Sequence, residues 1–164
     1  MTAGAPCATV PLTCHAAHGR SASPGGRFVI THLMRDEVAD RPVADVTLAG
    51  KTLQENELVR DARLLLQREA VKSVPVLVGE RYVGVIDRSS LDGVEDGEAV
   101  GRLAHGSVPT VTVATTAAAA LEALDAHEAS RLVVLAEDGA TYVGLICLRG
   151  DRRRLCIDTD RLGL

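Results

Sequence analysis

The chain has 164 residues, a net charge of −4 at pH 7 and an apolar content of 46%. This length suits one domain with a buried core, and the modest acidity argues against a dedicated nucleic-acid binder, which would carry a basic face. With one Phe, two Tyr and no Trp, the core must be built from Val, Leu, Ile and Ala. Such a core favours sheets faced by helices.

Neither a targeting signal nor a disulfide framework is evident in the sequence. No stretch approaches the roughly 20 apolar residues that span a bilayer, and the N-terminus lacks the charged and apolar regions of a secretory signal. We therefore expect a cytoplasmic protein without membrane contact. The four cysteines, Cys7, Cys14, Cys147 and Cys156, show no framework spacing, so reduced thiols are expected.

Residues 1–27 are rich in Ala, Gly, Pro, Ser and Thr and carry almost no charge. This composition is typical of a flexible linker and predicts a disordered leader. A metal site could be drawn from Cys7, Cys14, His15 and His18. However, these residues form no Cys-x-x-Cys or His-x3-His pair, and nothing apolar nearby would fold around an ion. We predict no metal site.

Residues 28–92 are expected to hold a lead-in and a first repeat. The apolar run 28–30 is either a strand or a hydrophobic plug laid onto the domain, and residues 36–44 suggest a short helical lead-in that Pro42 stops. The linker and second repeat are expected over 93–152, and a C-terminal tail over 153–164.

Two copies of one supersecondary unit account for most of the chain after the lead-in. Val74-Pro75-Val76-Leu77 falls on Leu132-Val133-Val134-Leu135, and Tyr82-Val83-Gly84-Val85-Ile86 falls on Tyr142-Val143-Gly144-Leu145-Ile146. Each copy reads strand, helix, strand, strand and short helix, with a Gly-containing turn between the last two strands. The predicted elements are a helix over 56–70 and strands over 74–78 and 82–86, then a strand over 108–113, a helix over 115–129 and strands over 132–136 and 142–146. Asn56 and either Thr115 or Thr116 are the expected N-caps. The repetition predicts an α/β domain with a pseudo-two-fold axis.

This order of elements, the Val-Pro-Val-Leu strand and the Tyr-Val-Gly-Val-Ile strand resemble the CBS domain, named for cystathionine β-synthase. The resemblance covers residues 42–152. It implies two tandem β-α-β-β-α repeats in a pseudo-two-fold CBS pair, also called a Bateman module. Pairs of this family often dimerise, and they bind adenine nucleotides or S-adenosyl compounds in clefts between the repeats.

The family motif Gly-h-h-Thr/Ser-x-x-Asp/Asn, where h is apolar, supplies a hydroxyl for phosphate and a carboxylate for the ribose. This chain departs from it in both copies. The first copy has Asp87 in place of the hydroxyl residue and Ser90 in place of the carboxylate. The second has Cys147 and Gly150 at these positions. A carboxylate at position 87 disfavours a nearby phosphate, so a nucleoside with few or no phosphates is less penalised there than a triphosphate.

The resemblance implies a stand-alone regulatory CBS-pair protein that binds AMP, ADP, ATP or an S-adenosyl compound and signals by conformational change to an effector protein. The alternative is a ligand-free module for dimerisation or protein interaction. Either form is expected to be a homodimer, without a cofactor. The expected ligand-binding residues are Thr47, Val74, Pro75, Asp87 and Ser90 in a first set, and His105, Thr110, Arg131, Leu132 and Cys147 in a second.

A few further residues offer other chemistry. The Arg149–Arg154 segment suggests either a phosphate or nucleic-acid contact or a solvated tail, and His127 suggests an exposed helix end. Cys147 is expected to pack as a small apolar residue; a redox switch with Cys156 is the alternative. No nucleophile elbow, phosphate-binding loop or His-Glu-x-x-His motif is present, so no enzymatic activity is expected.

Overall fold

The computed structural model describes residues 30–158. The predicted leader, residues 1–27, lies outside this range. In chain order the elements are β1 (Ile30–Met34), α1 (Arg35–Val38), η1 (Val43–Val46), β2 (Leu53–Gln54), α2 (Val59–Leu66), β3 (Ser73–Val78), β4 (Arg81–Asp87), η2 (Ser89–Leu91), η3 (Val100–Leu103), β5 (Thr110–Thr112), α3 (Ala117–Ala126), β6 (Arg131–Leu135), β7 (Tyr142–Leu148) and β8 (Arg154–Asp158), where η marks a 3₁₀ helix.

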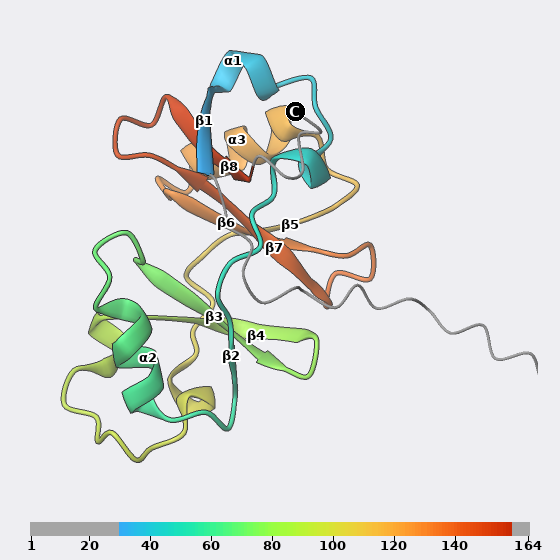
Figure 1. Ribbon diagram of the computed structural model, residues 1–164. Helices are drawn as coiled ribbons and strands as arrows, with labels where there is room; N and C mark the ends of the chain where they lie inside the picture. The colour runs from blue at the N-terminus through green and yellow to red at the C-terminus, as the bar shows by residue number, and fades with distance from the viewer. Residues whose placement is uncertain (1–29, 159–164) are drawn as a thin grey trace, which may run out of the picture.

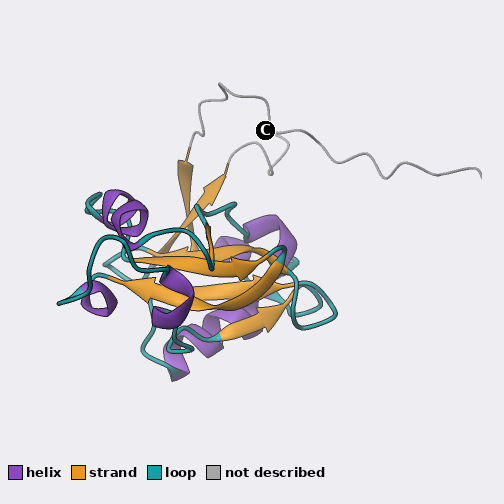
Figure 2. Cartoon of the chain, turned by 90° about the horizontal axis from the view of Figure 1, so that it is seen from below, coloured by secondary structure: helices purple, strands orange, loops and turns teal. Residues whose placement is uncertain are grey.

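The strands form two sheets, which occupy the lower and upper halves of Figure 1. The lower sheet has the order β2-β3-β4, and the upper sheet has the order β1-β8-β7-β6-β5. In each sheet the strand before the helix pairs parallel with the strand after it, which then forms an antiparallel hairpin. Figure 2 shows helices on the outer sides of the strand layers. The predicted α/β architecture with two related units is confirmed.

The two hairpins repeat each other in detail. The pairing register shifts between Val76 and Leu77 in the first and between Val134 and Leu135 in the second, which are corresponding positions. The turn glycines, Gly79 and Gly139, both have positive φ, at 62° and 66°. Residues with a Cβ seldom adopt this conformation, so glycine suits both turns.

The lead-in of each repeat packs against the other repeat. Val38, Val43 and Val46 are fully buried in the core under α3, in the second unit. Val100, from the linker before the second repeat, is fully buried in the core of the first unit. In Figure 1 the teal turn formed by η1 lies beside α3. The order of repeats along the chain therefore differs from the grouping of segments in space.

Backbone hydrogen bonds hold these exchanged segments in place. In the second unit, Ala117 N donates to Arg41 O at 3.1 Å, at the start of α3. In the first unit, Val59 N donates to Glu98 O at 2.9 Å, at the start of α2. The first N–H groups of a helix have no partner within it, so the exchanged segments satisfy donors that would otherwise be unpaired.

A third apolar cluster joins the units. It contains Val85 from the first unit and Val133, Leu135 and Leu145 from the second, with Tyr82, Val108 and Tyr142 packed against it. At its edge the hairpins exchange backbone bonds, because Tyr82 N donates to Ala140 O and Tyr142 N donates to Glu80 O, both at 2.9 Å. This reciprocal pairing relates the two repeats as the predicted pseudo-two-fold axis requires.

The end of the second repeat differs from the prediction. The segment expected to be a tail, 153–164, contains β8, which pairs with β7 and β1. Leu155 and Ile157 are 1% and 0% exposed and alternate with polar or less buried neighbours, the period expected of a strand with one buried face. No short helix follows β7 within residues 30–158; a turn leads directly into β8.

Of the two predicted N-caps, one is wrong and one is confirmed. Helix α2 begins at Val59 with Leu58 as N-cap, not Asn56, and the Asp61 side chain accepts a hydrogen bond from Leu58 N at 3.3 Å. Thr116 caps α3 as expected, because its Oγ1 accepts from Ala119 N at 3.3 Å.

Candidate functional site

The repeated glycines of β4 and β7 mark the places where a lead-in segment crosses the opposite repeat. Leu48 exchanges two backbone hydrogen bonds with β7, at 2.7 and 2.9 Å, and His105 exchanges two with β4, both at 2.9 Å. A Cβ on Gly84 would lie 2.9 Å from His105 O, and one on Gly144 would overlap Leu48 O. Glycine is needed because the two backbones approach so closely. The crossing therefore places residues of one repeat next to the Gly-h-h-Thr/Ser-x-x-Asp/Asn motif positions of the other repeat.

The crossing at β4 assembles a polar cluster. Asp87, at the end of β4, accepts hydrogen bonds on Oδ1 from the Ser89 hydroxyl at 2.6 Å and from Ser90 N at 3.0 Å. His105 places Nε2 3.0 Å from the Ser90 hydroxyl and 3.6 Å from Asp87 Oδ2. Ser107 lies 2.8 Å from the other ring nitrogen of His105. Sequence patterns identified Asp87, Ser90 and His105, but Ser89 and Ser107 carried no signal beyond their proximity to these residues.

Asp87 is a stable anion in this cluster. The hydrogen bond from the Ser89 hydroxyl, with further bonds from Ser90 and the nearby His105, lowers the pKa of Asp87 against the opposing effect of burial. Its side chain retains 35% of its exposure. The position where the family places a hydroxyl for phosphate therefore carries a fixed negative charge that solvent or a ligand can reach.

The corresponding position of the second repeat has different chemistry. Cys147 lies directly opposite Arg131 across β6 and β7. Arg131 donates to Ala70 O at 2.7 Å and to Ser73 O at 3.2 Å, so its guanidinium ties the second unit to the first. Hydrogen bonding with Cys156 and the charge of Arg131 lower the pKa of Cys147 to about 6, although burial acts in the opposite direction.

Several expected ligand residues are not available at a surface. Val74 and Leu132 are 0% exposed and lie in the two helix-side cores, so the expectation that their side chains line a cleft is corrected. Alternate residues of a strand face opposite sides, and these two face the helices. Pro75 is also buried, whereas Thr110 on β5 is exposed. Thr47 is 0% exposed and donates its hydroxyl to Val43 O at 2.7 Å.

Two of the expected ligand residues lie beside the other repeat from the one with which they were grouped. His105 was grouped with the second repeat but lies beside Asp87 and Ser90 of the first. Thr47 was grouped with the first repeat, but its methyl group lies against Gly144 of the second. The reason is the crossing of the lead-in segments, which sequence alignment of the repeats does not reveal.

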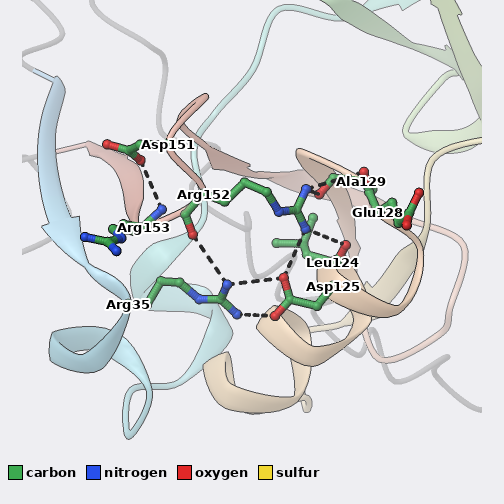
Figure 3. A network of polar contacts seen from close by, with 8 residues as sticks. All are labelled: Arg35, Leu124, Asp125, Glu128, Ala129, Asp151, Arg152 and Arg153. Carbon is green, nitrogen blue, oxygen red and sulfur yellow. Dashed lines mark hydrogen bonds and ion pairs between the residues drawn. The ribbon is translucent and has the colours of Figure 1, made fainter.

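The arginine-rich segment after β7 serves the fold. Figure 3 shows Arg152 beside the end of α3, where it donates to Leu124 O at 3.2 Å and to Ala129 O at 3.1 Å. Arg152 and Arg35 both contact the carboxylate of Asp125, with Arg152 Nη2 at 3.0 Å. The hydrogen bonds from Arg35 and Arg152 lower the pKa of Asp125 to about 2. This network links α1, α3 and the turn before β8.

The neighbouring arginines are also engaged within the chain. Arg154 Nε donates to Asp151 at 2.8 Å, and Arg149 Nη1 lies 2.9 Å from His32 Nε2. These contacts, with those of Arg152, favour a structural role for the segment over the phosphate contact considered from the sequence. His127 is exposed at the C-cap of α3, as expected.

Two surface hollows are lined by none of the expected ligand residues. One, of about 300 Å³, is lined by Arg63, Leu66, Gln67, Arg88, Leu91 and Asp92. Its arginines are occupied: Arg63 donates to Leu91 O at 2.9 Å, and Arg88 donates to Leu66 O at 2.9 Å. The other, of about 430 Å³, is lined by Glu55, Asn56, Ala99, Gly101 and Arg102.

Residues 30–158 contain no group of His, Cys, Asp and Glu side chains arranged to hold a metal ion. The candidates Cys7, Cys14, His15 and His18 lie outside the described part of the chain. Within that part, no helix has both the length and the apolar character needed to cross a membrane.

The fold and its repeated glycine motif define a tandem α/β module in which each lead-in segment crosses the opposite repeat at a glycine. The family model of the CBS domain matches residues 30–93 and 100–149, and the chain belongs to this family. A search of curated proteins finds no match.

Solved structures show the same fold. A hemolysin-like protein containing a CBS domain from Oenococcus oeni PSU has 20% identity and a TM-score of 0.55, with 69% of this chain and 89% of that chain covered. The CBS domains of a transcriptional regulator from Streptococcus pneumoniae have 18% identity and a TM-score of 0.53, with 70% and 92% covered. The CBS domain of the bacterial CNNM/CorC family Mg2+ transporter in complex with ATP has 21% identity and a TM-score of 0.55, with 68% and 84% covered.

Proposed function

We propose that this CBS pair is a regulatory module whose ligand is an adenosyl compound that lacks phosphate charge, with S-adenosylmethionine as the best example. The ligand sits against Asp87, Ser90 and His105, and its binding favours one arrangement of the two repeats, which an effector protein reads. The observation that carries the proposal is the anionic, partly exposed Asp87 at the position where the family motif has a hydroxyl.

Charge selects among the adenosine-containing ligands. A unit charge 4 Å from a carboxylate interacts with it by between about 1 kcal/mol in water and about 4 kcal/mol at an effective dielectric constant of about 20. This energy is repulsive for a phosphate and attractive for a sulfonium. In S-adenosylmethionine the sulfonium occupies the 5′ position, where a nucleotide carries its phosphate. Asp87 therefore favours the S-adenosyl compound.

The structural relative in complex with ATP supports the general idea that a module of this fold accommodates an adenine nucleotide. Its identity of 21% extends the likeness to the fold only. The ligand preference proposed for this chain rests instead on Asp87 and on His105, which the crossing segment adds to the cluster.

A ligand-free interaction module is the second candidate. It is favoured by the mutual hydrogen bonding of Asp87, Ser90 and His105, because groups that already satisfy one another gain less from a ligand. In this case the pair would act as a homodimer or as a docking unit for a partner.

Thermal unfolding with adenosine, S-adenosylmethionine, AMP and ATP tests the proposal. A ligand at about a hundred times its Kd stabilises the folded state by about 2.7 kcal/mol, which is a shift of several degrees for a chain of this size. We expect the largest shift with S-adenosylmethionine and the smallest with ATP. A larger shift with ATP would contradict the charge argument, and no shift with any ligand, together with a dimer in light scattering, would support the interaction module.

The double variant Asp87→Thr with Ser90→Asp tests directly whether these two positions set the ligand preference, because it restores the family motif. We expect its preference to move towards AMP and ATP. The single variant Asp87→Thr and the control Asp92→Thr form the matched pair, because each removes one negative charge, Asp92 at an exposed position five residues further along the chain. If both variants change the preference equally, overall charge and not the Asp87 site is responsible.

A further inference from the structure

Four side chains form a row across the upper sheet. His32 on β1 lies opposite Cys156 on β8, Cys156 lies opposite Cys147 on β7, and Cys147 lies opposite Arg131 on β6. Directly opposed residues in a sheet point to the same face, so the two thiols are neighbours. Both cysteines are partly exposed. They lie on the face opposite the α3 core, because Leu148 and Leu155, the next residues in register, are buried in that core.

The backbone spacing suits a disulfide between them. Arg149 N donates to Arg154 O at 2.8 Å, and hydrogen-bonded pairs recur at every second residue of an antiparallel ladder. Cys147 and Cys156 are therefore a hydrogen-bonded pair, for which the Cα atoms lie about 5.5 Å apart. Disulfides span Cα separations of about 4.4–6.8 Å, most often about 5.5–6 Å. The Cα spacing is therefore within the disulfide range, and a local adjustment of the two strands brings the Cβ atoms to the separation of about 3.5–4.5 Å that the bond needs.

The surroundings of the pair give its two thiols different pKa values. Arg131 is held beside Cys147 by its bonds to Ala70 O and Ser73 O. Its charge and the hydrogen bond with Cys156 lower the pKa of Cys147 to about 6, while the same hydrogen bond and burial raise the pKa of Cys156. These directions favour Cys147 as the thiolate and Cys156 as the thiol near neutral pH, the arrangement of an attacking and a resolving cysteine.

We propose that Cys147 and Cys156 form a redox-active pair that is reversibly oxidised by low-molecular-weight disulfides of the glutathione type. The Cys147 thiolate attacks one sulfur of the small disulfide, forming a mixed disulfide and releasing one thiolate. Cys156 then loses its proton and attacks Cys147 Sγ, which forms the internal disulfide and releases the second small thiolate. The two protein thiols are oxidised, the small disulfide is reduced to two thiols, and excess small thiol reverses both steps.

This modification does not depend on the proposed adenosyl ligand. The first repeat has Ser73 and Asp87 at the positions of Arg131 and Cys147, so thiol chemistry is confined to the second. Arg131 also anchors the second unit to carbonyls of the first. Oxidation removes the thiolate beside this guanidinium. Because Arg131 joins the two repeats, the modified pair lies next to an inter-repeat contact.

The experiment uses the full chain with Cys7→Ser and Cys14→Ser, so that only the proposed pair can react. The reduced protein is incubated with oxidised glutathione at pH 7, quenched by acid and analysed by intact mass and by peptide mapping. We expect one internal disulfide that links Cys147 to Cys156 and that excess reduced glutathione reverses. Failure to form this bond, or formation of disulfides only between chains, would overturn the proposal.

Single substitutions separate the two roles. In Cys156→Ser the reaction should stop at the mixed disulfide, with one glutathione retained on Cys147. In Cys147→Ser the remaining thiol should react at least tenfold more slowly. Arg131→Gln should slow the reaction of Cys147 at pH 7 several-fold, and Arg131→Lys should restore part of the rate. Equal reactivity of the two cysteines, or no effect of Arg131→Gln, would contradict the assigned roles.

Discussion

Gly144→Ala tests whether the crossing of the lead-in over β7 depends on the absence of a side chain. A Cβ at this position would lie closer than 3.0 Å to both Leu48 O and the methyl carbon of Thr47, whereas ordinary contact begins at 3.4 Å. Thr47 is fully buried and Leu48 is fixed to β7 by two backbone hydrogen bonds. Neither neighbour can move aside without disturbing the crossing.

The expected loss of stability follows from these contacts. Overpacking of a buried site costs about 1–3 kcal/mol. Each backbone hydrogen bond between Leu48 and Leu145 that is lengthened or lost adds about 0.5–1.5 kcal/mol. The lower conformational entropy of Ala in the unfolded chain offsets about 0.4–1 kcal/mol. We expect Gly144→Ala to lower the free energy of unfolding by about 2–5 kcal/mol, a large part of the 5–15 kcal/mol typical of a domain.

Equilibrium unfolding in urea, followed by circular dichroism, measures this change. Gly84→Ala should cost less, because its Cβ would meet the His105 backbone at 2.9–3.0 Å. Gly97→Ala is the control, since nothing lies within 4 Å of the added carbon and its φ is not positive. The expected order of destabilisation is Gly144, Gly84, Gly97. A Gly144→Ala protein as stable as Gly97→Ala would refute the close approach of the two backbones.

Further predictions concern acid stability, thiol reactivity and the lead-in. The pKa of Asp125 is about 2 in the folded chain, against an ordinary value of 3.8, so its contribution to stability is present above pH 3.8 and is lost as the pH falls towards 2; acid titration of Asp125→Asn should show a weaker loss over this range. Alkylation of Cys147 by iodoacetamide should rise with pH through about 6 and level off by about pH 7.5, whereas a midpoint near the ordinary thiol value of 9.0 would contradict the thiolate assignment. Val46→Ala, in the lead-in, should lower stability by about 1–3 kcal/mol in urea unfolding, while Leu64→Ala, at a position 61% exposed, should change it by less than about 0.5 kcal/mol.

Local patterns predicted the repeated hairpins well. The apolar runs beginning at Val74 and Leu132 form β3 and β6, and the Gly-containing turns separate them from β4 and β7 as expected. These elements depend on interactions between near neighbours in the chain. The pattern of apolar residues and turn glycines in each segment is therefore enough to predict them. The alternating residues of β8 carried the same kind of signal. The arginine-rich segment before them predicts a tail, whereas in the structure this segment forms the turn, with Arg152 at a φ of 55°, that returns the chain alongside β7.

The candidate sites depend on contacts that no local pattern reports. His105 reaches Asp87 only because the linker crosses β4, and Cys156 reaches Cys147 only because β8 returns alongside β7. Sequence patterns identified Asp87, His105 and Cys147 as candidate ligand residues and named Cys156 only as the alternative redox partner of Cys147. The distances between them are set by strand register and by packing at the pseudo-two-fold interface.

The sequence by itself determined the repeat, the α/β elements and the family, because a repeated pattern of apolar residues, glycines and turns is written in residues close together in the chain. Tertiary structure alone decided which segments belong together. Val38, Val43 and Val46 complete the core of the opposite repeat, and the crossing that carries them there rearranges the expected ligand residues. The physical reason is that burial of apolar surface is not directional. A lead-in can cover the core of either repeat, and only close packing and backbone pairing at Leu48 and His105 select the exchanged arrangement.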